Sequence, residues 1–213
     1  MKDAILFDLD GTLWDSVEGC VHAWNEVLAR HPEAGDPLTP ERMCAYMGKT
    51  TQQIARLMMP TLTEEQSLAI MDECSAHEHE FLRAHGGGRL YDGVLKTLDA
   101  LHRDYDLFII SNCESGYIEI FLDLNDAWPL FSGRACPGDT GLLKGDNIRL
   151  VLENAGHPRA FYLGDTDGDE RAARQAGIPF VHAAYGFGSA ISPDAVLERF
   201  CDLPQLARAL FSR

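Results

Sequence analysis

Two aspartates separated by a single residue are the first feature of the sequence that could do chemistry. Asp8 and Asp10 stand in the run Asp8-Leu9-Asp10-Gly11-Thr12, directly after the apolar run Ala4 to Phe7. In an extended chain, residues two apart point the same way and lie roughly 6 to 7 Å apart, so both carboxylates can flank one reacting group. Because open α/β sheets bind their ligands at the carboxyl ends of parallel strands, this run is a candidate reaction centre.

A second acidic run has the same position relative to an apolar segment. Gly164-Asp165-Thr166-Asp167-Gly168-Asp169 follows the apolar run Ala160 to Leu163 and precedes a stretch with helical periodicity. Three converging carboxylates at the end of a strand are costly unless a cation neutralises them. Neither acidic run fits an EF-hand calcium loop, because Gly19 and Ala176 stand where the closing glutamate is required.

Three further polar residues are informative only together with the acidic runs. Ser111 and Asn112 follow the apolar run Leu107 to Ile110, and Lys144 stands in Leu143-Lys144-Gly145-Asp146. Taken singly, a serine after a strand is commonly a helix cap and a lysine is commonly a solvated surface charge. Their weight comes from their order along the chain and their positions relative to the acidic runs.

The alternation of apolar runs with helical segments predicts how these residues are positioned. Short apolar runs are typical of buried strands and cover Ala4 to Phe7, Leu107 to Ile110, Gly133 to Cys136, Ala160 to Leu163 and Ile178 to Val181. Helical periodicity covers Val94 to Arg103, Tyr117 to Leu124, Asn147 to Ala155, Glu170 to Ala176 and Pro193 to Arg199. This alternation predicts a doubly wound α/β core, a Rossmann-like parallel sheet with helices on both faces.

Residues 15–85 interrupt the alternation, because they contain helical patterns and no convincing strand. Thr63 with Gln66 three residues later forms a capping-box pattern that predicts the start of a long helix within this segment. We therefore expect an inserted, all-helical cap domain over residues 15–85. Residues 1–14 and 86–213 are expected to form the α/β catalytic core.

Composition restricts the partners and the compartment. The chain of 213 residues has a formal net charge of −15, so neither nucleic acid nor an acidic membrane is an expected partner. Its apolar runs are far shorter than the ~20 residues that span a bilayer. Six cysteines without a CxxC pair, and an N-terminus without a signal-peptide pattern, predict a reduced, cytoplasmic protein. A phosphorylated ligand would need a bound cation to offset the acidic surface.

On these residues, the sequence resembles the haloacid dehalogenase superfamily of phosphohydrolases, whose four motifs are all present in order. Within it, the layout resembles the phosphoglycolate phosphatase group, which carries a helical cap after the first strand, and Tyr185-Gly186-Phe187-Gly188 resembles a loop of that group. The resemblance implies a Mg²⁺-dependent phosphatase acting on a small phosphorylated metabolite, with phosphoglycolate as a candidate substrate. The matched positions are Asp8, Asp10, Ser111, Lys144, Asp165 and Asp169.

The resemblance also implies roles for the matched residues. Asp8 is the expected nucleophile, which becomes phosphorylated, and Asp10 is the expected general acid and base. Mg²⁺ is expected on Asp8, the Asp10 backbone carbonyl and Asp165, while Asp169 bonds a metal-bound water or Lys144. Asp167 is expected to be a solvated residue at a helix start. The expected phosphate contacts are Thr12, Ser111, Asn112 and Lys144.

Two other functions and one cap residue stay open at this point. A phosphotransferase or mutase on the same fold would return the phosphoryl group to a sugar, and the core motifs do not separate it from a phosphatase. A non-catalytic phosphate-binding regulator is disfavoured by the intact catalytic set. In the expected cap, Gly48 permits a tight turn that presents Lys49, which we expect to contact the substrate's leaving group; a solvated surface lysine is the alternative. The sequence indicates no oligomeric state.

Overall fold

A six-stranded parallel sheet forms the centre of the protein. The structure is a computed structural model that describes residues 2–156 and 158–212. The strands lie in the order β5-β4-β1-β6-β7-β8, and each pairs in parallel with its neighbours. The prediction of a parallel α/β core is confirmed. The strands are β1 (Ala4–Phe7), β4 (Asp106–Ile110), β5 (Gly133–Ala135), β6 (Ala160–Gly164), β7 (Phe180–Ala183) and β8 (Ala195–Leu197).

The central strands β1, β4 and β6 are buried on both faces, which explains why they consist largely of continuous apolar runs. Successive side chains of a strand point to opposite faces, and accordingly Ile5 and Phe7 belong to one apolar cluster whereas Ala4 and Leu6 belong to another. The first cluster includes residues of α5 (Val94–Leu101), α6 (Tyr117–Leu124) and α10 (Leu203–Phe211). The second includes residues of α8 (Lys144–Asn154) and α9 (Asp167–Ala176).

The C-terminal region differs from the prediction. The predicted helix over Pro193 to Arg199 is wrong, because Ala195–Leu197 forms the edge strand β8. The carboxylate of Asp194 accepts a hydrogen bond from the Phe180 backbone N–H at 2.8 Å, and its own N–H donates to the Phe180 carbonyl at 2.9 Å. Asp194 therefore ties its segment to the start of β7 instead of capping a helix. The last helix, α10, was not predicted.

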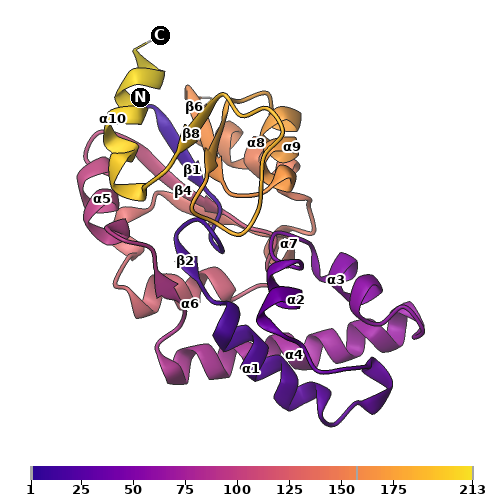
Figure 1. The fold of residues 1–213 in the computed structure, drawn as a ribbon. Coiled ribbons are helices and arrows are strands. Elements are labelled where there is room, and N and C mark those ends of the chain that lie inside the picture. The colour runs from indigo at the N-terminus through magenta and orange to yellow at the C-terminus, as the bar shows by residue number, and fades with distance from the viewer. Residues whose placement is uncertain (1, 157, 213) are drawn as a thin grey trace.

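Four of the helices that lie between β1 and β4 in the sequence form a separate lobe. These are α1 (Val17–Leu28), α2 (Pro40–Cys44), α3 (Thr51–Met58) and α4 (Glu64–His85). The predicted capping box at the start of α4 is present, with Thr63 and Gln66 bonding each other's backbone. Figure 1 shows α1 to α4 together at one end of the molecule, away from the sheet, with β2 between them. Shorter elements are the helix α7 (Pro137–Thr140) and 3₁₀ turns at Pro32–Ala34, Trp128–Leu130 and Phe200–Asp202.

The two chain segments that join the lobe to the sheet pair with each other. Strand β2 (Trp14–Asp15) lies antiparallel to β3 (Arg89–Leu90), with Trp14 opposite Leu90. This short ribbon was not predicted, because two-residue strands carry no periodicity. None of the helices in the described part of the chain is long and apolar enough to span a membrane.

Candidate active site

Three neighbouring strands place the candidate residues at one edge of the sheet. β1 lies between β4 and β6, and Asp8, Ser111 and Asp165 directly follow β1, β4 and β6, respectively. All three side chains are buried, with at most 5% of their surface exposed. Parallel pairing therefore brings together residues that are more than fifty positions apart in the sequence.

One ammonium group lies among the buried carboxylates. Lys144 Nζ donates to Asp8 Oδ1 at 2.9 Å and to Asp169 Oδ1 at 2.6 Å. Lys144 is only 4% exposed and is the first residue of α8, which begins three residues earlier than predicted. The side chain of Asn147 explains the earlier start, because it accepts from Thr140 Oγ1 and donates to the Leu142 carbonyl. The helix start thus fixes Lys144 against Asp8.

The carboxylates are too close together for one ammonium to balance. One oxygen from each of Asp8, Asp165 and Asp169 lies within 4.8 Å of the others. Burial, followed by the charge of Asp169, raises the pKa of Asp8 to about 7, against the effect of Lys144. Burial, then Asp169 and Asp8, also raises the pKa of Asp165 well above its ordinary value. Burial alone would lower the pKa of Lys144, but Asp169 and Asp8 raise it well above its ordinary value.

The loop after β7 orients Asp165. The backbone N–H groups of Phe187 and Gly188 donate to Asp165 Oδ2 at 2.8 and 3.3 Å. A Cβ at Gly186 would overlap Asp165, so only glycine lets the loop approach this closely. Asp165 Oδ1, in contrast, is buried without a hydrogen-bond partner among the described residues. An unpaired buried carboxylate oxygen beside two other carboxylates fits a hard divalent cation such as Mg²⁺.

Asp169 is engaged on both oxygens. Its Oδ1 accepts from Lys144, and its Oδ2 accepts from the N–H and hydroxyl of Thr166 at 3.0 and 2.7 Å. The second pair belongs to the capping box that starts α9. Asp167, at the first residue of that helix, is exposed and pairs with Arg171. This geometry agrees with the expectation that Asp169 bonds Lys144 and that Asp167 is solvated.

Asp10 is held by three donors on one oxygen. Asp10 Oδ1 accepts from Trp14 Nε1 at 2.9 Å, from Ser16 Oγ at 2.6 Å and from Tyr117 Oη at 2.9 Å. Burial raises the pKa of Asp10, and the hydrogen bonds from Ser16, Tyr117 and Trp14 oppose the rise. Trp14 belongs to the ribbon that leads to the helical lobe, Ser16 directly follows β2, and Tyr117 begins α6. Asp10 is thus fixed where the sheet and the lobe meet.

The expected phosphate contacts are not all in the same place. Ser111, Asn112 and Lys49 line one cavity with Asp8 and Asp10, whereas Lys144 lines an outer cleft that also includes Asn112 and Lys49. Thr12 lines neither of these two; its side chain is fully buried, and its carbonyl accepts from Tyr185 Oη at 3.0 Å.

The helical lobe contacts the core directly at this cavity. Asn112 Nδ2 donates to the Gly48 carbonyl at 2.9 Å, and Thr51 Oγ1 donates to the carboxylate of Glu114. Gly48 has a φ of +77°, as expected for the predicted tight turn, and places Lys49 half-buried between this cavity and an outer cleft that also reaches Lys144.

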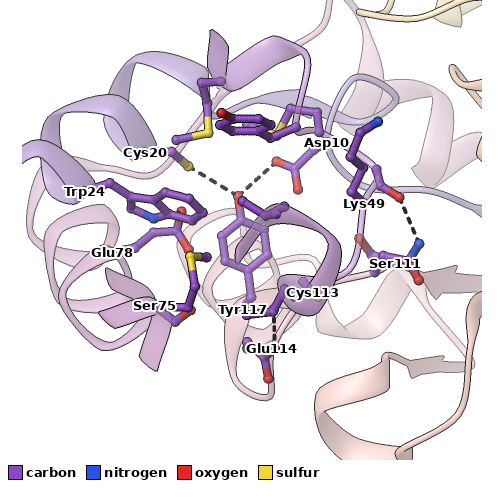
Figure 2. Close-up of a pocket in the computed structure, with 18 of the residues that line it drawn as sticks. Asp10, Cys20, Trp24, Lys49, Ser75, Glu78, Ser111, Cys113, Glu114 and Tyr117 are labelled. Atoms are coloured by element: carbon purple, nitrogen blue, oxygen red, sulfur yellow. Dashed lines mark hydrogen bonds between the residues drawn. The ribbon is translucent and has the colours of Figure 1, made fainter. Parts of the chain in front are cut away.

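The cavity extends from the catalytic aspartates into the helical lobe. Its volume is about 70 Å³, enough for a small ligand and well below that of a drug-sized pocket. Figure 2 shows Cys20, Trp24 and Glu78 on one side and Lys49 and Ser111 on the other.

Several of these residues were not identified from the sequence. Ser16 and Tyr117 are missed because a polar residue at a helix start has the common explanation of a cap, yet the Ser16 hydroxyl donates to Asp10 and does not cap α1. Glu78 is missed because a glutamate within a helix is ordinarily solvated. A signal for Glu78 exists, since it lies at helical spacing from the buried Met71 and Cys74 of α4.

Residues 5–183 match the sequence model of the family described as haloacid dehalogenase-like hydrolase, and the chain belongs to this family. Its relatives include the phosphoglycolate phosphatase of Aliivibrio fischeri, 30% identical over 92% of each chain. The phosphoglycolate phosphatase of Agrobacterium fabrum is 28% identical over 98% of this chain and 94% of its own. The expected class of enzyme, a phosphoric monoester hydrolase, is confirmed.

Solved structures share the fold at lower identity. A haloacid dehalogenase-like family hydrolase from Streptococcus pneumoniae superposes with a TM-score of 0.82 at 21% identity, over 98% of both chains. CbbY from Rhodobacter sphaeroides, solved in complex with phosphate, superposes with a TM-score of 0.76 at 24% identity, over 95% of this chain and 96% of its own.

Proposed function

We propose that the chain is a Mg²⁺-dependent phosphatase that hydrolyses a small phosphate monoester through a phosphoaspartyl intermediate at Asp8. One observation carries the proposal: the buried carboxylate of Asp8 bonds Lys144 Nζ at 2.9 Å and lines the same small cavity as Ser111 and Asp10. The proposed nucleophile, the phosphate ligand Ser111 and the proton donor therefore line one cavity, and Lys144 reaches Asp8 from the adjoining outer cleft. Phosphoryl transfer needs this combination of an in-line nucleophile, compensation of oxygen charge and a proton for the leaving group.

The two half-reactions divide between two aspartates. A carboxylate oxygen of Asp8 attacks phosphorus, the bond to the ester oxygen breaks, and protonated Asp10 gives its proton to that oxygen. Water then attacks the phosphorus of the acyl phosphate, Asp10 accepts the water's proton, and inorganic phosphate leaves with Asp8 restored. The burial of Asp10 favours its neutral form, and its three donors hold it in place for both steps.

The phosphate and the cation would be held by separate groups. Lys144 and Ser111 are proposed to bind phosphate oxygens, with Asn112 and Lys49 beside them. Asp8, Asp165 and the Asp10 backbone carbonyl are proposed to hold Mg²⁺, and Asp169 to fix Lys144. When bound, Mg²⁺ would supply positive charge that offsets the carboxylates and the phosphate.

We also propose that residues 15–85 act as a cap domain on a core of residues 1–14 and 86–213. The β2–β3 ribbon supplies the two connections, and the Asn112–Gly48 contact closes the lobe over the cavity. A closed lobe would keep bulk water out while the phosphoryl group passes from the ester to Asp8, and water would enter for the second step after the leaving group has left the cavity. A reducing, cytoplasmic location is part of the proposal, because the six cysteines are free.

The proposed function is tested by release of inorganic phosphate from a panel of small phosphate esters that includes phosphoglycolate, with Mg²⁺ and with excess chelator. We expect turnover only with the cation. Asp8→Asn should lose it, whereas Asp167→Asn, a matched change at the exposed aspartate of α9, should retain it. A mutase would transfer the phosphoryl group without net phosphate release, and a phosphate-binding regulator would release none, so either result contradicts the proposal.

A further inference from the structure

The wall of the active-site cavity that faces away from the phosphate ligands carries one charge. The side chains that α1, α2 and α4 contribute to this wall are Cys20, Trp24, Met43, Met71, Ser75 and Glu78. Glu78 is the charged member of this set, and it is only 7% exposed. Glu78 lies among methionine and tryptophan side chains, which is unusual because glutamate is rarely buried without a partner.

The contacts of Glu78 leave its charge uncompensated. Trp24 Nε1 donates to Glu78 Oε1 at 3.0 Å, whereas the Cys20 thiol, which also lines this wall, donates to Ser16 Oγ at 3.5 Å. The indole donor is neutral, and none of the ion pairs found in the described part of the chain includes Glu78. Burial raises its pKa to about 7, with a further contribution from Asp10. A buried carboxylate without a cationic partner is stabilised most by a ligand that donates a hydrogen bond to it.

The other charged groups of the cavity lie elsewhere. Lys49 stands at the junction with the outer cleft, next to the Gly48–Asn112 contact, and the carboxylate of Glu114 is bonded by Thr51. Tyr117 lies between the two ends, because its hydroxyl donates to Asp10 and lies 3.9 Å from Cys20 Sγ (Figure 2). A substrate with its phosphate near Asp8 and Ser111 therefore projects its leaving group past Tyr117 toward Glu78.

From this arrangement we infer that Glu78 determines substrate specificity by accepting a hydrogen bond from the leaving group. The substrate class is a small phosphate monoester whose leaving group ends in an ammonium or hydroxyl group, and a terminal carboxylate is disfavoured. Above pH 7, where Glu78 is ionised and the comparison of substrates is made, a ligand carboxylate at this place would meet the buried carboxylate of Glu78, and like charges in such contact are unfavourable. The inference rests on the proposed phosphatase function.

The test uses three substrates that differ only at the far end of a two-carbon leaving group. These are 2-phosphoglycolate, 2-hydroxyethyl phosphate and O-phosphoethanolamine, measured on the full chain with Mg²⁺. We expect kcat/KM for the hydroxyl and ammonium esters to exceed that for phosphoglycolate by at least about tenfold. A wild-type preference for phosphoglycolate overturns the inference while leaving the phosphatase function intact. If the protein hydrolyses none of these three esters and none of the wider panel, both the inference and the proposed phosphatase function are overturned.

Variants test whether Glu78 causes the preference. The readout is the ratio of kcat/KM for O-phosphoethanolamine to that for phosphoglycolate, because a general loss of folded enzyme cancels in a ratio. Glu78→Gln should reduce this ratio about tenfold or more, and Glu78→Asp, which keeps the charge, should preserve the order of substrates. Glu80→Gln removes an exposed charge from the same helix and should not change the ratio. An unchanged ratio in Glu78→Gln overturns the assignment.

Discussion

Replacement of Glu78 by glutamine should make the stability of the protein less dependent on pH. Burial raises the pKa of Glu78 from 4.5 to about 7 in the folded chain. Between these two values the unfolded chain releases a proton that the folded chain keeps, so the free energy of unfolding falls as pH rises. Below pH 4.5 both states are protonated, and above pH 7 both are ionised, so the loss is confined to this window.

The size of the effect follows from the shift. One pKa unit corresponds to ~1.36 kcal/mol, so the full window costs the wild-type chain about 3 kcal/mol. Between pH 5 and pH 8, about 2 kcal/mol of this should be measurable. Glutamine has nearly the same shape and does not ionise. Glu78→Gln should therefore gain about 2 kcal/mol relative to wild type on going from pH 5 to pH 8.

Urea unfolding of wild type, Glu78→Gln and Glu80→Gln at both pH values measures this difference, with chelator present so that cation binding does not contribute. The comparison between variants removes the contributions of the other carboxylates that titrate in this range. Glu80→Gln should follow wild type, because Glu80 is exposed. If Glu78→Gln changes the free energy of unfolding by the same amount at pH 5 and pH 8, the burial of this carboxylate is refuted. A gain at pH 5 instead of pH 8 would mean that a cation pairs with it.

Three further predictions concern positioning, substrate binding and the cation. Tyr117→Phe removes one of the three donors to Asp10, so kcat should fall about tenfold with little change in KM, as steady-state kinetics would show. Lys49→Ala should raise KM several-fold without a comparable loss of kcat, and a loss confined to kcat would place Lys49 outside substrate binding. Gly186→Ala displaces the loop that holds Asp165, so half-maximal activation should need about tenfold more Mg²⁺; an unchanged titration would remove this loop from the cation site.

Much of the fold could be predicted from the sequence, because the central strands are buried on both faces. Such strands appear as continuous apolar runs, and the runs ending at Phe7, Ile110 and Leu163 coincide with β1, β4 and β6 or differ by one residue at an end. The run Ile178 to Val181 is displaced by two residues from β7, which spans Phe180–Ala183. Edge strand β8 was mistaken for a helix, since it is paired on one side only and its three residues are too few to show a strand pattern.

The candidate site was predicted where polar residues directly follow buried strands. Asp8 and Asp165 stand out there because a carboxylate after an apolar run is costly without a partner, and the structure brings them together with Lys144. The residues around Asp10 were not predictable in the same way. Tyr117 reaches Asp10 across 107 positions of sequence, and Glu78 enters the cavity only because α4 packs on α1 and turns this face inward. Such contacts arise from tertiary packing, which spacing along one element does not encode.

Covalent labelling of Asp8 tests the central claim most directly. A phosphate ester labelled at phosphorus is mixed with excess enzyme and Mg²⁺, the reaction is quenched with acid within milliseconds, and the labelled peptide is identified. The proposed mechanism predicts label that appears and decays at rates compatible with turnover, attached to Asp8 and lost in Asp8→Asn. Label on another residue, or phosphate release with inversion at phosphorus and no labelled enzyme, would contradict it.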